Sequence, residues 1–341
     1  MKTSVHLLTA IFLVIVSCNS DHQQNSCMPP ASYFTKHSNG IQNGGVEMIT
    51  INTLKGDFKV WTKTIGNNPS VKVLLVNGGP GLTHEYFECF ENFLPAAGIE
   101  FIYYDQLDCG NSDHPNDTSL YDLARCTDEI EQVRKALHLD ESNFFLLGHS
   151  WGGIVAIEYS LKYQSHLKGL IISDMMCSAS EYDKYADDVL SKTMPVAVVD
   201  SIRLIEKNND YSNPRYMELL MPNYYAQHIC RIPVAEWPEP VQRSFSKLNS
   251  GFYVTMQGPS EFGISGKLEN WERKNVMKNI TVPTLSIGAK YDTMDPAHME
   301  WISKEVKNGS FLFCENGSHM CFYDDQENYF QGLISWIGKV K

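Results

Sequence analysis

The sequence predicts an α/β protein with a mostly parallel central sheet that helices cover on both faces. Short, nearly continuous apolar runs are typical of strands buried on both faces, and here they alternate with stretches of helical length. Residues 46–64 form two partly alternating runs around Gly56-Asp57, which predicts a β-hairpin at the antiparallel edge of the sheet. The apolar runs are residues 71–76, 99–104, 143–147, 167–173, 282–287 and 311–314.

The alternation of strands and helices is interrupted once, by a long segment. Residues 175–275 are rich in aromatic side chains and contain helix-like patches at 186–206 and 214–228. We therefore expect one sheet domain, formed by residues 45–174 and 276–341, with a helical cap inserted between its sixth and seventh strands. A long insertion at the carboxyl edge of a parallel sheet usually shapes a substrate site.

Composition and charge exclude some classes of function. The chain has 341 residues, of which 43% are hydrophobic, and it carries a formal net charge of -12. This apolar fraction is enough for a substantial core. Because there is no long basic block, nucleic acid is not expected as a partner. The nine cysteines include no Cys-x-x-Cys pair, so we expect no zinc or other metal site.

Residues 1–18 have the pattern of an export signal. Lys2 gives a short basic start, residues 7–16 are mostly apolar, and the segment closes with Ile-Val-Ser-Cys. This ending resembles the lipobox of bacterial lipoproteins, in which the cysteine, here Cys18, is lipidated. An ordinary signal peptide with a chance cysteine is the alternative. Residues 19–44 would form a flexible tether, and we expect an exported protein of the cell envelope or periplasm that meets the membrane only through its lipid anchor.

The strongest catalytic signal is the sequence Gly-His-Ser-Trp-Gly-Gly at 148–153. It lies between the apolar run that ends at Leu147 and the helix-like stretch 154–163. A strand that passes through Gly-x-Ser-x-Gly into a helix is typical of a nucleophile elbow, where glycines permit the sharp turn that exposes the serine. Ser150 is therefore the candidate nucleophile.

A serine hydroxyl is a weak nucleophile at neutral pH, so it needs a base to take its proton and an acid to orient that base. Two histidines come late enough in the chain, since the acid is expected to precede the base. His319 lies in a loop just past the predicted strand 311–314, at the expected carboxyl edge of the sheet. His298 falls inside a helix and is better explained as a helix-surface residue. We therefore predict His319 as the base.

Two carboxylates follow the predicted strand 282–287. Asp295 precedes Pro296, which is the pattern of a helix N-cap with proline at the first helical position. Asp292 lies in the loop directly after the strand. Asp292 is therefore the predicted acid of the triad.

The charge that develops on the attacked carbonyl needs backbone N–H donors, which together form the oxyanion hole. One expected donor is the amide of Trp151, the residue after the nucleophile. The other should come from the loop after the strand 71–76, which is Asn-Gly-Gly-Pro-Gly at 77–81. Proline has no N–H, so this donor is Gly79 or Gly78, and we take Gly79.

These segments resemble those of the proline iminopeptidases, which are serine exopeptidases of the α/β-hydrolase fold. The likeness covers about residues 45–340, and its Tyr-Asp-Gln and cap segments are far more specific than Gly-x-Ser-x-Gly. The resemblance implies removal of an amino-terminal residue, preferably proline, from peptides. The matching positions are the oxyanion loop at 77–81, Tyr-Asp-Gln at 104–113, the elbow at 148–153, Gly-Pro-Ser-Glu-Phe at 258–262, the acid Asp292 and the base His319.

The resemblance also implies that Glu261 binds the α-amino group of the substrate, although it could be a solvated cap residue. An exopeptidase must recognise a free amino terminus, and a buried ammonium group without a partner is costly, so a carboxylate is expected in the cap. Two positions depart from the family pattern. Asn77 replaces the usual histidine, and Thr293 stands where some members have a second amine-binding glutamate.

We therefore expect a serine aminopeptidase that acts through an acyl-enzyme on short peptides or amino-acid amides with a free amino terminus. Such a mechanism needs no cofactor. An amino-acid amidase or esterase with the same triad is the alternative, and a non-catalytic tethered binding protein is a remote one. Epoxide and haloalkane hydrolases usually have an aspartate at the elbow, where this chain has Ser150.

Overall fold

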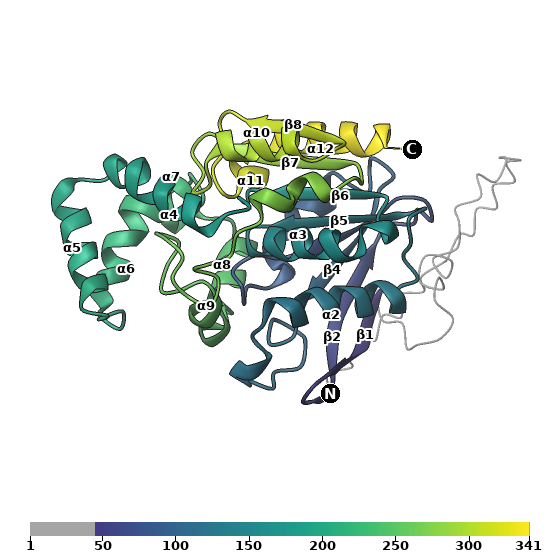
Figure 1. Ribbon diagram of the computed structural model, residues 1–341, viewed down its shortest axis with the longest axis horizontal. Coiled ribbons are helices and arrows are strands. Elements are labelled where there is room, and N and C mark those ends of the chain that lie inside the picture. Colours follow the sequence, from purple (N-terminus) through teal and green to yellow (C-terminus); the bar gives the residue numbers. More distant parts are fainter. Residues whose placement is uncertain (1–44, 341) are drawn as a thin grey trace, which may run out of the picture.

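The computed structural model describes residues 45–340 (Figure 1). The predicted export signal, the lipidation candidate Cys18 and the tether 19–44 lie outside the described residues. Within residues 45–340, no helix combines the length and the apolar character needed to cross a membrane. The seven cysteines in this part of the chain are free and buried.

Eight strands form one sheet in the order β1-β2-β4-β3-β5-β6-β7-β8. β2 pairs antiparallel with β1 and with β4, and all other neighbouring strands are parallel. This confirms the mostly parallel sheet with an antiparallel edge. The strands are β1 (Val46–Thr53), β2 (Gly56–Ile65), β3 (Lys72–Val76), β4 (Glu100–Asp105), β5 (Phe144–His149), β6 (Gly169–Ser173), β7 (Thr284–Ala289) and β8 (Gly309–Cys314).

The turn of the β1–β2 hairpin lies earlier than the sequence predicted. Thr53 is opposite Gly56, so the turn consists of Leu54 and Lys55, and the prediction of a turn at Gly56-Asp57 was wrong. Gly56 is the first residue of β2 and has a φ of 119°, a conformation that glycine adopts readily. Gly56 therefore lies at the end of the turn rather than at its centre.

Side chains of the buried strands alternate between two apolar cores, one on each face of the sheet. Leu74 and Val76 of β3 join the core under α2, α3 and α10. Val73 and Leu75 join the opposite core, which η1 and α12 cover. Both faces are thus covered by helices, as the near-continuous apolar runs predicted (Figure 1). The covering elements are η1 (His84–Asn92), α2 (Leu123–Ala136), α3 (Trp151–Tyr163), α10 (Pro296–Glu305) and α12 (Gln326–Lys339).

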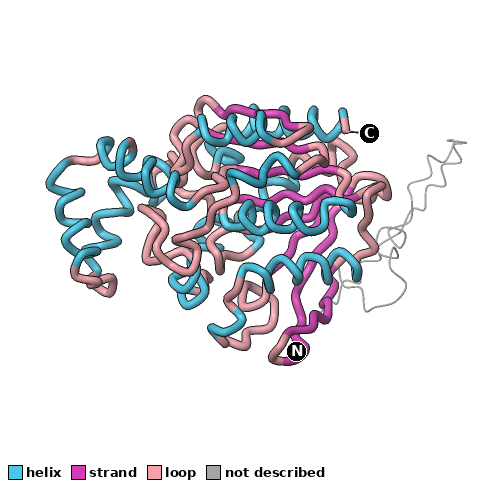
Figure 2. The backbone as a smooth tube through the Cα atoms, in the orientation of Figure 1, coloured by secondary structure: helices cyan, strands magenta, loops and turns pink. Residues whose placement is uncertain are grey.

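Between β6 and β7 the chain leaves the sheet and forms helices and loops beyond the ends of the strands (Figure 2). This is the segment predicted as a cap, and α5 and α6 lie farthest from the sheet (Figure 1). The cap contacts the predicted oxyanion loop, because Asn249 N–H donates a 3.0 Å hydrogen bond to the carbonyl oxygen of Gly81. Its main helices are α4 (Ala179–Asp188), α5 (Val196–Lys207), α6 (Pro214–Leu220), α7 (Ala226–His228), α8 (Glu239–Ser246) and α9 (Ser250–Met256).

The contact between α3 and β3 should make Gly152 hard to replace. A Cβ atom at Gly152 would lie 2.0 Å from the carbonyl oxygen of Val76, so the helix would have to move away from the sheet. We expect Gly152→Ala to lower the free energy of unfolding by about 3 kcal/mol, measured by urea denaturation. Gly338→Ala is the matched control in α12, where a Cβ meets nothing within 4 Å, and it should stabilise by about 0.5–1 kcal/mol. Equal effects of the two substitutions would contradict this interpretation.

Candidate active site

Ser150 stands at the turn where β5 passes directly into α3. Its backbone has φ 56° and ψ −127°, a combination that residues other than glycine rarely adopt. Two glycines make this turn possible. A Cβ at Gly148 would lie 2.0 Å from the carbonyl oxygen of Gly152, and one at Gly152 would lie equally close to that of Val76. The geometry is that of a nucleophile elbow.

Asp292 and His319 meet at the carboxyl end of the sheet, in the loops after β7 and β8. His319 Nδ1 lies 2.7 Å from Asp292 Oδ1, and both side chains are buried. Because an ionised carboxylate only accepts hydrogen bonds, Nδ1 carries the proton of the neutral ring. Nε2 is then left as an acceptor, which is the state that a base for a serine proton requires.

The two rival candidates from the sequence have other roles. Asp295 caps α10 by accepting a 2.9 Å hydrogen bond from Ala297 N–H. His298 lies on α10 with Nε2 3.3 Å from the backbone nitrogen of Cys177. The prediction that His298 is a helix-surface residue was wrong, since α10 packs against the sheet and leaves this side chain only 8% exposed.

Ser150, His319 and Glu261 line one small cavity under the cap. Among residues 45–340, no hydrogen bond joins Ser150 Oγ to the His319 ring, and such bonds often tighten only when substrate completes a site. The wall is otherwise mostly apolar. Its other members are Gly78, Gly79, Leu82, His149, Ile229, Phe245 and Met320.

The structure distinguishes between the two glycines considered as oxyanion donors. Gly78 N–H donates a 2.6 Å hydrogen bond to the Tyr86 hydroxyl and is therefore occupied. The N–H groups of Gly79 and Trp151 have no hydrogen-bond acceptor in the described part of the chain. Gly79 lines the cavity and Trp151 directly follows Ser150, so these two amides are the ones free to receive an oxyanion.

Asn77, where the resemblance led us to expect a histidine, holds the oxyanion loop through its side chain. Its Nδ2 donates a 2.6 Å hydrogen bond to the carbonyl oxygen of Leu82, across the loop. Its Oδ1 and its carbonyl oxygen face Gln106 Nε2, at 3.3 and 3.1 Å. Gln106 Oε1 in turn accepts a 3.0 Å hydrogen bond from the Trp151 indole. The Tyr-Asp-Gln segment therefore joins the oxyanion loop to the residue after the nucleophile, a role that its sequence alone did not reveal.

Four tyrosines of the cap surround Glu261. The Tyr253 hydroxyl donates a 2.6 Å hydrogen bond to Glu261 Oε1, and Tyr182 and Tyr224 donate to its carbonyl oxygen. The Tyr225 hydroxyl accepts a hydrogen bond from its N–H. Glu261 is only 9% exposed, so it is not the solvated cap residue that the sequence allowed as an alternative.

Residues 72–326 match the family model described as alpha/beta hydrolase fold. The chain is 54% identical to a proline iminopeptidase of Chitinophaga pinensis over 293 residues, which are 86% of this chain and 98% of the relative. It is 55% identical, with the same coverage, to a proline iminopeptidase of Flavobacterium johnsoniae. The chain belongs to the proline iminopeptidase family. It is therefore a hydrolase of the prolyl aminopeptidase type, as its motifs predicted.

Solved structures agree on the fold. The crystal structure of VinJ matches with a TM-score of 0.79 at 24% identity, covering 86% of this chain and 99% of VinJ. The proline iminopeptidase of Mycobacterium smegmatis matches with a TM-score of 0.75 at 23% identity, covering 86% of this chain and 98% of that protein. Both similarities support the α/β-hydrolase architecture.

Thr293 lies beside Asp292 and His319, at the position where the resemblance allowed a second glutamate. Its hydroxyl lies 3.3 Å from Asp292 Oδ1 and 3.3 Å from His319 Nδ1. It adds a hydrogen-bonding group but no charge. Among the described residues that line the cavity, Glu261 therefore supplies the only carboxylate.

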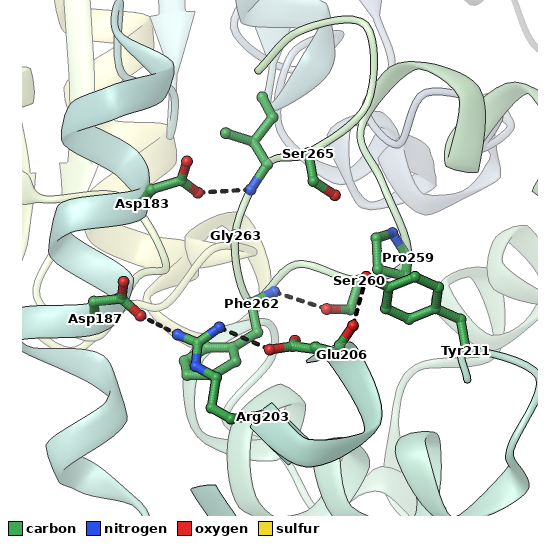
Figure 3. Close-up of a pocket in the computed structure, with 11 residues that line it drawn as sticks. Asp183, Asp187, Arg203, Glu206, Tyr211, Pro259, Ser260, Phe262, Gly263 and Ser265 are labelled. Carbon is green, nitrogen blue, oxygen red and sulfur yellow. Dashed lines mark hydrogen bonds and ion pairs between the residues drawn. The ribbon is translucent and has the colours of Figure 1, made fainter. Parts of the chain in front are cut away.

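A second cavity, outside the catalytic one, lies against the loop that carries Glu261 (Figure 3). Arg203 pairs with Asp187 and Glu206 and stacks on the Phe262 ring, with 4.3 Å between guanidinium carbon and ring centroid. Asp183, which also lines the cavity, accepts a 2.8 Å hydrogen bond from Ile264 N–H. These contacts connect α4 and α5 to the residue after Glu261. The cap helices therefore fix the position of the loop.

Burial and charge act in opposite directions on His319. Burial alone would lower its pKa, but the Asp292 carboxylate and its hydrogen bond raise the pKa above the usual histidine value. Burial also raises the pKa of Glu261, although His319 and the Tyr253 hydroxyl lower it. A base must be neutral and an ammonium receptor must be ionised. Activity should therefore fall as acid protonates both groups.

Replacing Asp292 with asparagine should move the acidic limb of the pH–rate profile. Without the carboxylate the pKa of His319 falls, so the ring stays neutral to lower pH and the limb shifts to lower pH. The maximal rate should drop by about 10⁴-fold, because the ring is no longer held in its reactive tautomer. The labelling rate of Ser150 by a fluorophosphonate measures this, since the probe carries no amine and does not need Glu261. Asp295→Asn is the control and should leave the limb in place. A limb that stays in place for Asp292→Asn would contradict the assignment.

Proposed function

We propose that this enzyme removes an amino-terminal residue, preferably proline, from short peptides through an acyl-enzyme on Ser150. The observation that carries the proposal is that Glu261 lines the same small cavity as Ser150 and His319. A carboxylate at this place can hold the free amino group of a peptide while the first carbonyl faces the serine. The apolar wall of the cavity suits the hydrocarbon ring of proline.

One carboxylate oxygen of Glu261 is left available to a cationic partner. Its Oε1 accepts a hydrogen bond from Tyr253, whereas Oε2 has only a long 3.5 Å contact with the Tyr182 hydroxyl. Because burial raises its pKa, the ionised carboxylate is costly without a cationic partner. A bound ammonium group offsets that cost, and a blocked amino terminus does not.

The reaction follows from the placement of the groups. His319 takes the proton of Ser150, whose oxygen attacks the carbonyl of the first residue. The N–H groups of Gly79 and Trp151 stabilise the oxyanion, and Asp292 stabilises the protonated His319 ring. His319 then protonates the leaving nitrogen, and the shortened peptide departs. Water, activated by His319, releases the amino acid from the serine, and no step needs a metal or organic cofactor.

Glu261→Gln should separate amine recognition from triad chemistry. For proline p-nitroanilide, kcat/KM should fall by a factor equivalent to about 2–5 kcal/mol, because the substrate ammonium loses its partner. Fluorophosphonate labelling of Ser150 should stay close to the wild-type rate. Glu269→Gln, an exposed acid of the cap, is the matched control, and Ser150→Ala gives the inactive baseline.

Each outcome of this experiment has a distinct meaning. Full activity of Ser150→Ala would overturn the mechanism, and full activity of Glu261→Gln would overturn only the amine role. Equal cleavage of free and N-acetylated proline p-nitroanilide by the wild type would favour the amidase or esterase alternative.

We also propose that the protein is exported and anchored by a lipid on Cys18. The pattern of residues 1–18 supports this. The Chitinophaga pinensis and Flavobacterium johnsoniae relatives align over 98% of their own length but only 86% of this chain, so part of this chain has no counterpart in them.

Cys18→Ala should abolish lipid attachment. In bacteria that express the full chain, metabolic labelling with a fatty-acid analogue should mark the wild type and place it in the membrane fraction. Cys18→Ala should be unlabelled, and Cys27→Ala, the other cysteine of the segment outside the described residues, should behave as the wild type. An unlabelled wild type would contradict the anchor and leave only an ordinary signal peptide.

A further inference from the structure

His149, the residue before the nucleophile, has a hydrogen bond at each ring nitrogen although it is only 1% exposed. Its Nε2 lies 2.7 Å from the carbonyl oxygen of His319, and its Nδ1 lies 3.1 Å from the Tyr86 hydroxyl. A carbonyl oxygen only accepts, so Nε2 carries the proton of a neutral ring. Nδ1 must then accept a hydrogen bond from Tyr86.

Tyr86 continues this chain of hydrogen bonds to the oxyanion loop. Its hydroxyl oxygen accepts a 2.6 Å hydrogen bond from Gly78 N–H, and a backbone N–H can only donate. The hydroxyl proton is thus directed to His149. All three bonds therefore run one way, from Gly78 through Tyr86 and His149 to His319, and His149 directly precedes Ser150.

The ionisation states of both side chains agree with this order. Burial lowers the pKa of His149 well below its usual value, and the neighbouring His319 lowers it further. Burial likewise raises the pKa of Tyr86, so its hydroxyl keeps its proton. A protonated His149 would place a second N–H opposite Tyr86 and remove the acceptor for the buried hydroxyl.

We propose that Tyr86 and His149 are positioning residues that hold the oxyanion amide of Gly79 and the base His319 in fixed places on either side of Ser150. The inference depends on the proposed peptidase mechanism. With the N–H of Gly78 tied to Tyr86, the next amide of the loop is the one directed to the cavity. The carbonyl of His319 is hydrogen-bonded to His149, which belongs to the elbow. The oxyanion loop, the elbow and the loop that carries His319 are therefore held together as one unit.

Aromatic packing around the pair is separate from this polar chain. The His149 ring makes edge contacts with Phe322 and Phe87, at centroid distances of 5.1 and 6.1 Å, and Tyr86 also packs on Phe87. Tyr86→Phe keeps these ring contacts and removes only the hydroxyl. His149→Gln keeps an amide N–H that can reach the His319 carbonyl, and His149→Phe keeps neither hydrogen bond.

The test compares kcat and KM for proline p-nitroanilide, together with the rate of fluorophosphonate labelling. We expect Tyr86→Phe to lower kcat and the labelling rate about 10- to 100-fold with little change in KM, since small misplacements of reacting groups cost rate rather than binding. His149→Phe should lose more than His149→Gln. The kcat of the double variant Tyr86→Phe/His149→Gln should be no more than about 3-fold below that of the slower single variant, because both substitutions interrupt the same series of hydrogen bonds.

Tyr103→Phe is the matched control. This buried tyrosine belongs to the same apolar core. Its hydroxyl donates a 3.0 Å hydrogen bond to Glu91 and lies 3.5 Å from the Phe87 carbonyl oxygen, so it is not part of the chain from Gly78 to His319. It should keep the wild-type kcat even if its melting temperature falls. Because labelling needs no peptide, it reports on the pair even if the enzyme proved not to cleave proline amides.

Three results would overturn the proposal. The first is a folded Tyr86→Phe with wild-type kcat and labelling rate, which remains informative even if the His149 variants fail to fold. The second is a loss confined to KM. The third is a double variant whose losses multiply, which would show that the two side chains act independently.

Discussion

The close approach of α3 to β3 is the constraint on which the catalytic site depends. At Gly152 the helix backbone lies so near the carbonyl of Val76 that no side chain fits between them. At this contact β5 turns directly into α3, and Ser150 has φ 56° and ψ −127°, a combination that residues other than glycine rarely adopt. It also places Trp151 N–H, which has no partner inside the helix, beside the nucleophile. The candidate nucleophile and one candidate oxyanion donor thus lie beside a single packing contact.

The remaining groups reach Ser150 through the parallel sheet. β7 and β8 end on the same side as β5, so the loops that follow them carry Asp292 and His319 to one edge. The cap then closes this edge with Glu261. Its tyrosine partners and the ion pairs of α4 and α5 hold this acidic group in an apolar enclosure. The attraction between a carboxylate and an ammonium group is much stronger there than in water, because the local dielectric constant is lower. In the proposed mechanism, selectivity for an amino terminus and protection of the acyl-enzyme both come from this insertion.

Much of this arrangement could be predicted from local patterns. The apolar runs gave the strands, and their alternation with helices gave the parallel sheet, because buried strands leave a continuous apolar signal. Strand-end positions were enough to separate Asp292 from Asp295 and His319 from His298. The turn of the hairpin was predicted too late in the chain, because glycine is common both at the centre of a turn and at its end. The burial of His298 was missed because the pattern of one helix does not say which neighbour covers it.

The sequence by itself determined the fold class, the family and the candidates for nucleophile, acid and base. These depend on short-range signals, which are strand ends, glycines at a sharp turn and motifs with fixed spacing. Only the tertiary structure decided between Gly78 and Gly79, explained how Asn77 holds the oxyanion loop, and linked Tyr86 and His149 to the base. Those choices depend on which hydrogen bonds are already occupied between segments far apart in the chain, and folding in three dimensions is what brings their donors and acceptors together.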